Sequence, residues 1–218
     1  QSDYRSNGDI KSKLDKSVGT SNARGERYKT TMVNNMREEK GAWVTQLGGT
    51  KMVLGMGGDK DELTKMIKGT RTDTVAVLGD MASDVKLKKL TISSMAREPY
   101  NGIQTDPHRY SDSKVPNPGG GRGVDITSAS TRKEYGRLQG MVDWDKSFRQ
   151  ETEPSLAGKI TSYLGKDPRT SQVFTPWTVI DKGNARDPVS VNRIWSDPQK
   201  ASPTEWQHKN HIHFGTGQ

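Results

Sequence analysis

The histidines of this chain are the residues best suited to chemistry. His208, His211 and His213 stand close together near the C-terminus, and the remaining histidine is His108. Neutral imidazole is the commonest metal ligand in proteins, and two imidazoles with one carboxylate leave a zinc ion with an open position for water. The pattern therefore predicts a hydrolytic metal site.

Strand alternation indicates which of these side chains share a face. In residues 211–214 both histidines project to one side of a strand, and the apolar residues project to the other. Residues 124–126 alternate in the same way, so that the apolar neighbours anchor the strand and Asp125 points away from them. Two adjacent strands of this kind present Asp125, His211 and His213 on one polar face. A loop that carries His108 can close over that face.

Three ordered motifs give the chain a resemblance to a known group of proteins. They are Leu90–Arg97 followed by His108, then Gly121–Ile126, then His211–Phe214. The set resembles the lysostaphin/D-Ala-D-Ala-metallopeptidase/hedgehog zinc fold, over roughly residues 87–214. Its ending, His-x-x-His-x-His, is most similar to that of penicillin-insensitive murein endopeptidases.

The resemblance implies that Zn2+ is the cofactor and that its ligands are His108, Asp125 and His213. Asp112 is an alternative carboxylate ligand, because His108 and Asp112 have the His-x-x-x-Asp spacing of the lysostaphin-type branch. We prefer Asp125, which stands between apolar residues on a strand, whereas Asp112 lies in a polar loop.

The same resemblance implies a role for three further residues. His211 would polarise the metal-bound water or stabilise the oxyanion, and His208 would assist from the other side. Arg97 would bind carbonyl or carboxylate oxygens of the substrate. Zinc lowers the pKa of bound water toward ~7, and an imidazole that titrates near this pH can carry the proton to the leaving amine. We therefore expect a zinc metallopeptidase, an endopeptidase or a carboxypeptidase, that acts on peptidoglycan peptides.

Composition limits the alternatives. The chain has 218 residues, no cysteine and a formal net charge of +8. Any metal site must then use His and carboxylate ligands, and anionic partners are favoured. A metal-dependent nuclease is one alternative, but the Lys and Arg residues are scattered rather than gathered in a stripe, so we expect no nucleic-acid partner. A zinc-bound binding module without turnover is another, and His208 and His211 argue against it.

No apolar stretch approaches the roughly 18 residues that span a bilayer, and no signal-peptide core is present, so we expect no membrane span. The chain begins at Gln1 rather than Met, which suggests that an N-terminal piece was removed or not included. We expect a secreted or periplasmic protein, or one carried by a phage particle or a toxin-delivery system.

The expected fold is α+β, with a small antiparallel sheet that carries the zinc site, flanking helices and a polar N-terminal arm. Residues 1–40 form a flexible or weakly helical arm in this interpretation, open to a delivery or particle partner, and residues 41–218 form the catalytic domain. Periodicity predicts helices over 59–67, 73–85, 130–150 and 152–163. It predicts strands over 88–95, 124–127, 173–181 and 211–214. The Gly- and Pro-rich residues 98–123 are expected to form a long loop.

Overall fold

The computed structural model describes residues 4–97, 107–108, 120–132, 138–143, 155–184 and 186–217, and for residues 4–18, 132 and 138–143 only their backbone. The helices are α1 (Tyr4–Asn34), α2 (Lys60–Gly69), α3 (Thr72–Asp84), α5 (Ser155–Lys166), the short 3-10 helix η1 (Pro198–Lys200) and α6 (Pro203–Gln207). The strands are β1 (Arg37–Glu39), β2 (Ala42–Leu47), β3 (Thr50–Leu54), β4 (Leu87–Ser94), β5 (Gly123–Arg132), β6 (Leu138–Asp143), β7 (Thr170–Phe174), β8 (Thr178–Asp181), β9 (Val189–Val191) and β10 (Ile212–Thr216).

All of these strands belong to one 10-stranded sheet in the order β1-β2-β3-β4-β5-β10-β7-β8-β9, with β6 also paired to β5. Strands β3 and β4 are parallel, and the helices α2 and α3 connect them. A parallel pair needs such a crossover because its strands start at the same end of the sheet. The expected α+β class is confirmed, but the expected small antiparallel sheet is wrong, since the sheet is large and mixed.

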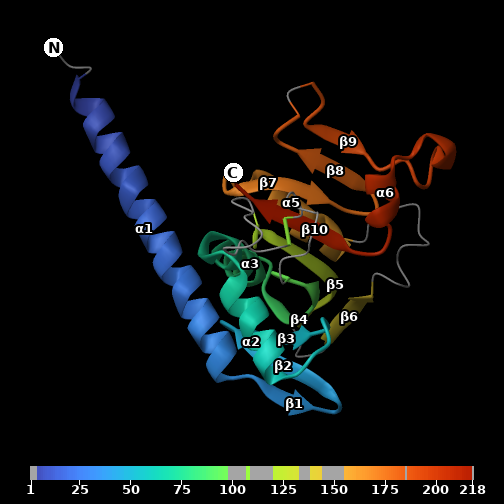
Figure 1. Ribbon diagram of the computed structural model, residues 1–218. Coiled ribbons are helices and arrows are strands. Elements are labelled where there is room, and N and C mark those ends of the chain that lie inside the picture. The colour runs from blue at the N-terminus through green and yellow to red at the C-terminus, as the bar shows by residue number, and fades with distance from the viewer. Residues whose placement is uncertain are drawn as a thin grey trace, which may run out of the picture.

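Helices α3 and α5 cover one face of this sheet (Figure 1). The alternation of β5 and β10 turns Val124, Ile126 and Phe214 toward these helices, and all three are fully buried. The intervening residues of the same strands face the other side of the sheet. The hydrophobic core therefore lies on the helical face, and on β5 and β10 the opposite face carries Asp125 and His213.

Helix α1 occupies most of the segment for which composition indicated a flexible or weakly helical arm. Its N-terminal part projects beyond the sheet, and its C-terminal half runs along α3 (Figure 1). The contact is close: a Cβ at Gly79 of α3 would overlap the Tyr28 ring. An ion-pair network adds to it, since Asp80 receives hydrogen bonds from Arg24 at 2.7 Å and from Arg169 at 3.0 Å. The boundary expected at residue 40 falls in the turn of the β1–β2 hairpin.

Several local predictions are confirmed. Helix α2 begins after Asp59, whose side chain accepts a hydrogen bond from the Glu62 amide, and α3, β4 and β10 lie where periodicity places them. Helix α5 overlaps the helix predicted over 152–163 but ends three residues later, and β5 contains the strand predicted over 124–127 but continues to Arg132. Within the residues described, no helix is long and apolar enough to cross a membrane.

Two local predictions are wrong. The helix expected over 130–150 is replaced by the end of β5 and by β6, which pair as Ala129 with Val142. Leu138 and Met141 have helical spacing, but long-range pairing overrides that weak local signal. The single strand expected over 173–181 is a hairpin of β7 and β8, with Thr175, Pro176 and Trp177 between the strands. Residues 133–137 and 144–150, and most of the loop expected over 98–123, lie outside the described residues.

Candidate metal centre

His108, Asp125 and His213 converge on the face of the sheet opposite the helices. Asp125 on β5 and His213 on β10 are directly paired across the two strands, so their side chains stand side by side. His108 is held against them by its backbone: its carbonyl accepts a hydrogen bond from the Arg97 amide at 2.5 Å, and the carbonyl of Pro107 accepts one from Gly123 at 3.1 Å. The predicted ligand set is therefore assembled.

The donor atoms are spaced almost as a tetrahedral ion requires. One ligand atom from each of the three side chains lies within 4.8 Å of the other two. His213 Nδ1 donates a hydrogen bond to Asp125 Oδ1 at 2.8 Å, and His108 Nε2 lies 3.4 Å from the same oxygen. Ligands at about 2.0–2.1 Å from zinc in a tetrahedron stand roughly 3.4 Å apart. Small side-chain rotations are enough to bring the three donors onto one ion.

The second nitrogen of each imidazole has a protein partner. His108 Nδ1 lies within hydrogen-bond distance of Ser94 Oγ, at 3.1 Å, and His213 Nε2 lies within hydrogen-bond distance of the Gln172 side-chain amide, at 2.9 Å. Such outer partners orient metal-binding histidines and fix the nitrogen that faces the ion. The structure leaves Nε2 of His108 and Nδ1 of His213 facing Asp125.

Two glycines make room for this arrangement. A Cβ at Gly123 would lie 3.0 Å from Cε1 of His108, and a Cβ at Gly215 would lie 2.8 Å from Nε2 of Gln172. Gly123 and Gly215 are cross-strand partners on β5 and β10. The absence of side chains at this pair lets the His108 ring and the Gln172 side chain come close to the backbone of β5 and β10.

Burial and charge keep Asp125 and His213 in the protonation states that bind cations. Asp125 and His213 are 9% and 3% exposed. Burial acts to raise the pKa of Asp125, but hydrogen bonds and charge from His108 and His213 outweigh it and hold that pKa well below its usual range. Burial lowers the pKa of His213 to about 4, against the opposing effect of Asp125. At neutral pH the site therefore holds a carboxylate and a neutral imidazole, the forms that bind a metal.

The other two histidines of the C-terminal cluster lie beside the three potential ligands. His211 Nε2 is 3.7 Å from Asp125 Oδ1, and its side chain is 17% exposed. His208 ends α6, and its ring centroid lies 5.0 Å from that of His211 and 5.3 Å from that of His213. The carbonyl of Thr204 lies 2.6 Å from His208 Nδ1. Burial lowers the pKa of both histidines, that of His208 to about 4.

Arg97 lies at the edge of the same cluster. Its Nε donates a hydrogen bond to Ser94 Oγ at 3.1 Å, so Ser94 links Arg97 to His108. The charge of Arg97 also acts on His211, whose pKa it helps to lower. All six predicted site residues are thus gathered at one place. Asp112, the alternative ligand, lies outside the described residues.

Ser94 and Gln172 were missed by sequence reasoning. Ser94 faces the site because the β4–β5 register shifts between Ile92 and Ser94, which brings Ser94 opposite Asp125. Gln172 faces the site because β7 pairs with β10 on the side away from β5. The glycine that follows His-x-His-Phe was the only sequence signal for the space that Gln172 fills.

Comparison of the chain with known protein families, with curated proteins and with solved structures finds no match.

Proposed function

We propose that this chain is a zinc-dependent peptidase that hydrolyses amide bonds in the peptide stems or cross-links of peptidoglycan. The observation that carries the proposal is the buried set of His108, Asp125 and His213, with His211 and His208 in contact with it. A set of two imidazoles and one carboxylate leaves a coordination position open, whereas purely structural zinc sites are closed by four protein ligands.

The donor set fits zinc better than a hard cation. Two of its three ligands are imidazoles, and the chain has no cysteine that could add a thiolate. Calcium and magnesium prefer sites built from oxygen ligands. When bound, zinc supplies Lewis acidity, which lowers the pKa of a coordinated water and polarises a carbonyl.

The remaining side chains supply the proton and charge chemistry. His211 stands next to Asp125 and is still partly exposed, so it can hold a proton at Nε2 and transfer it to a leaving amine. His208 is held at the end of α6, beside His211, by its hydrogen bond to the Thr204 carbonyl. Arg97 presents a positive charge on the His211 side and can orient a carbonyl or carboxylate oxygen of the substrate.

The substrate assignment rests on charge and on the resemblance of the ordered motifs to those of murein endopeptidases. A formal net charge of +8 favours association with an anionic cell wall. The resemblance adds the chemical class, an amide bond within a peptide stem or cross-link.

The test combines metal analysis with digestion. Purified protein is analysed for metal, then incubated with peptidoglycan sacculi, and the released muropeptides are identified by mass spectrometry. We expect about one zinc per chain and new free amino and carboxyl ends. Asp125→Asn should lose zinc, and His211→Ala should retain zinc but lose at least 100-fold in rate. Asp84→Asn, at an exposed carboxylate on α3, is the matched control.

Plasmid DNA and RNA are incubated in parallel. Cleavage of nucleic acid without cleavage of sacculi would overturn the proposal in favour of a nuclease. Zinc binding with no cleavage of any of these substrates would overturn it in favour of a binding module. Full activity of His211→Ala would overturn the role given to that residue.

A further inference from the structure

A continuous row of side chains leads from the metal centre to the edge of the sheet. Direct strand pairing joins Asp125 to His213, His213 to Phe174, Phe174 to Val179, and Val179 to Ser190. Directly paired residues project to the same face of a sheet. The face that carries the metal centre therefore continues without a break across β7 and β8 to β9.

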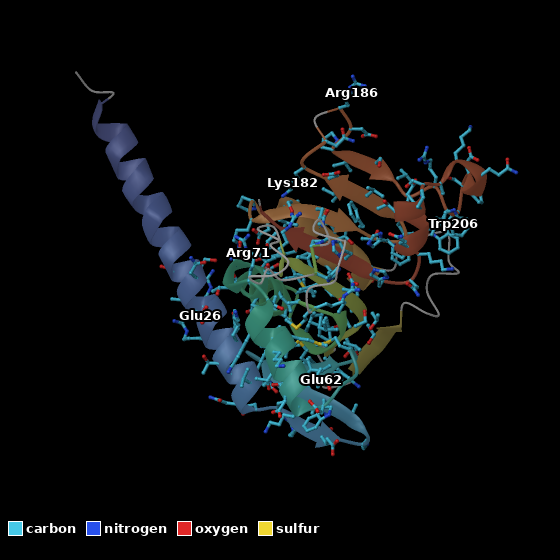
Figure 2. All side chains as sticks on the ribbon, viewed as in Figure 1. Glu26, Glu62, Arg71, Lys182, Arg186 and Trp206 are labelled. Atoms are coloured by element: carbon cyan, nitrogen blue, oxygen red, sulfur yellow. The ribbon has the colours of Figure 1, made fainter. Side chains whose placement is uncertain are left out.

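A cavity of about 620 Å³ lies over the outer part of this row. Phe174, Val179 and Ser190 line its floor, and Ser202 and Thr204, at the start of α6, line its wall. Figure 2 shows this corner of the molecule, with Trp206 on α6 and Arg186 at the far turn of the β8–β9 hairpin. The volume is within the range of roughly 300–1,000 Å³ that ligand sites occupy.

Two lining residues connect the cavity to the metal centre. The ring of Phe174 lies 5.0 Å from that of His208 and 5.6 Å from that of His213. Thr204 lines the cavity and meets His208 through its carbonyl. A ligand that fills the cavity must therefore approach the reacting centre from the His208 side, away from Arg97.

The side chains that line the cavity carry more negative than positive charge. Arg193 is neutralised by Glu205, with 2.9 Å between the guanidinium and the carboxylate. Asp181 and Asp187 also line the cavity, and among the described residues neither has a basic side chain within ion-pair distance. Phe174 and Val179 on the floor of the cavity offer apolar contact. An aliphatic chain that ends in an ammonium group matches this lining.

From these observations we infer that the cavity between β7–β9 and α6 binds the substrate segment next to the scissile bond, and that this segment carries a free amino group. The inference rests on the proposed peptidase function and names a feature of its substrate. A peptide bound in this way runs from Arg97, across His213, to Asp181 and Asp187.

The experiment uses full-length zinc-loaded protein and purified muropeptides cross-linked through a diamino acid, either with free amino groups or after acetylation of those groups. We expect acetylation to lower kcat/KM at least tenfold. Ser190→Trp, which fills the cavity, should also lower kcat/KM at least tenfold without changing the zinc content. Asp187→Asn should reduce the preference for the free amine. Ser83→Trp, on the exposed surface of α3, should behave as wild type.

Binding is measured separately, by calorimetric titration of zinc-loaded His211→Ala with the free-amine muropeptide. Cleavage that neither acetylation nor Ser190→Trp changes would overturn the subsite and leave the peptidase standing. Binding that Ser190→Trp removes, with no cleavage by the wild type, would overturn the peptidase and support the cavity as a peptide site. Neither binding nor cleavage would overturn both.

Discussion

Gln172 holds His213 from the side opposite Asp125, with 2.9 Å between the amide nitrogen and Nε2 of the imidazole. The contact depends on Gly215, because a Cβ at that position would lie 2.8 Å from the same amide nitrogen. An imidazole held at Nε2 keeps Nδ1 directed toward Asp125, and so toward the ion that the three side chains would share.

The first prediction concerns this contact. Gln172→Leu has a similar volume but no hydrogen bond, and we expect it to weaken zinc binding about 10- to 100-fold, the usual effect of removing an outer partner. Gln172→Glu retains an acceptor for an Nε2–H proton and should stay within about tenfold of the wild type. Competition with a chromophoric chelator measures the affinity. Gln46→Leu on β2 is the control, and equal affinities of Gln172→Leu and Gln46→Leu would remove Gln172 from the site.

The second prediction concerns the space occupied by His108. Gly123→Ala places a methyl group 3.0 Å from Cε1 and 3.1 Å from Nδ1 of His108, closer than the ring tolerates without moving. We expect zinc affinity to fall about tenfold while the protein remains folded. Gly49→Ala, where nothing lies within 4 Å, is the control. Unchanged zinc affinity in Gly123→Ala would show that the position of His108 is not critical for the ion.

Local sequence patterns were sufficient to predict most of the candidate site. Period-two alternation placed Asp125 and His213 on one strand face, and their direct pairing confirms it. The sequence indicated that a loop carrying His108 could close over that face, but the assignment of His108 as a ligand came from the resemblance. Ser94 and Gln172 could not be predicted, because one depends on a register shift and the other on which strand pairs with β10.

The fold was harder to predict for the same reason. Hydrophobic period and caps are local, and they predicted α2, α3 and β10. Pairing partners are long-range, so the size of the sheet and the parallel contact of β3 with β4 were not visible. The helix expected over 130–150 shows the limit: the spacing of Leu138 and Met141 fits a helix, and only pairing with β5 makes that segment a strand.

The third prediction separates the two possible carboxylate ligands. Asp125→Asn removes the only described carboxylate of the His108–His213 set, and we expect zinc affinity to fall at least 100-fold. Asp112→Asn should leave affinity within about twofold of the wild type. Both variants are compared by chelator competition at the same pH. A larger loss in Asp112→Asn than in Asp125→Asn would transfer the ligand role to Asp112.

The fourth prediction concerns the contact of α1 with α3. Gly79→Ala would push a methyl group into the Tyr28 ring, and overpacking of this kind costs about 1–3 kcal/mol. The better helix propensity of Ala offsets about 0.5–1 kcal/mol of this cost, so we expect a net loss of stability of about 0–2.5 kcal/mol. Denaturant unfolding measures it. Gly158→Ala in α5, with no atom within 4 Å, should instead stabilise the protein. A stabilising Gly79→Ala would mean that α1 does not pack there.

The last prediction concerns stability at low pH and involves Glu205 in α6, the helix that ends at His208. The carboxylate of Glu205 accepts hydrogen bonds from the Arg193 guanidinium, from the Arg193 backbone amide at 2.8 Å and from the Ser202 backbone amide at 2.6 Å. These interactions lower the pKa of Glu205 from 4.5 to about 2 despite burial. A carboxyl whose folded pKa is depressed stabilises the fold above its unfolded pKa, and this contribution is lost as pH falls from about 4.5 toward 2. The shift corresponds to about 3 kcal/mol at most.

Glu205→Gln should therefore be about 2–3 kcal/mol less stable than the wild type at pH 7, and the two should converge near pH 2. Unfolding free energies measured across this range test it, with Glu38→Gln on β1 as the exposed control. Parallel pH profiles for the wild type and Glu205→Gln would contradict the assignment, because the carboxylate would then contribute nothing that protonation removes.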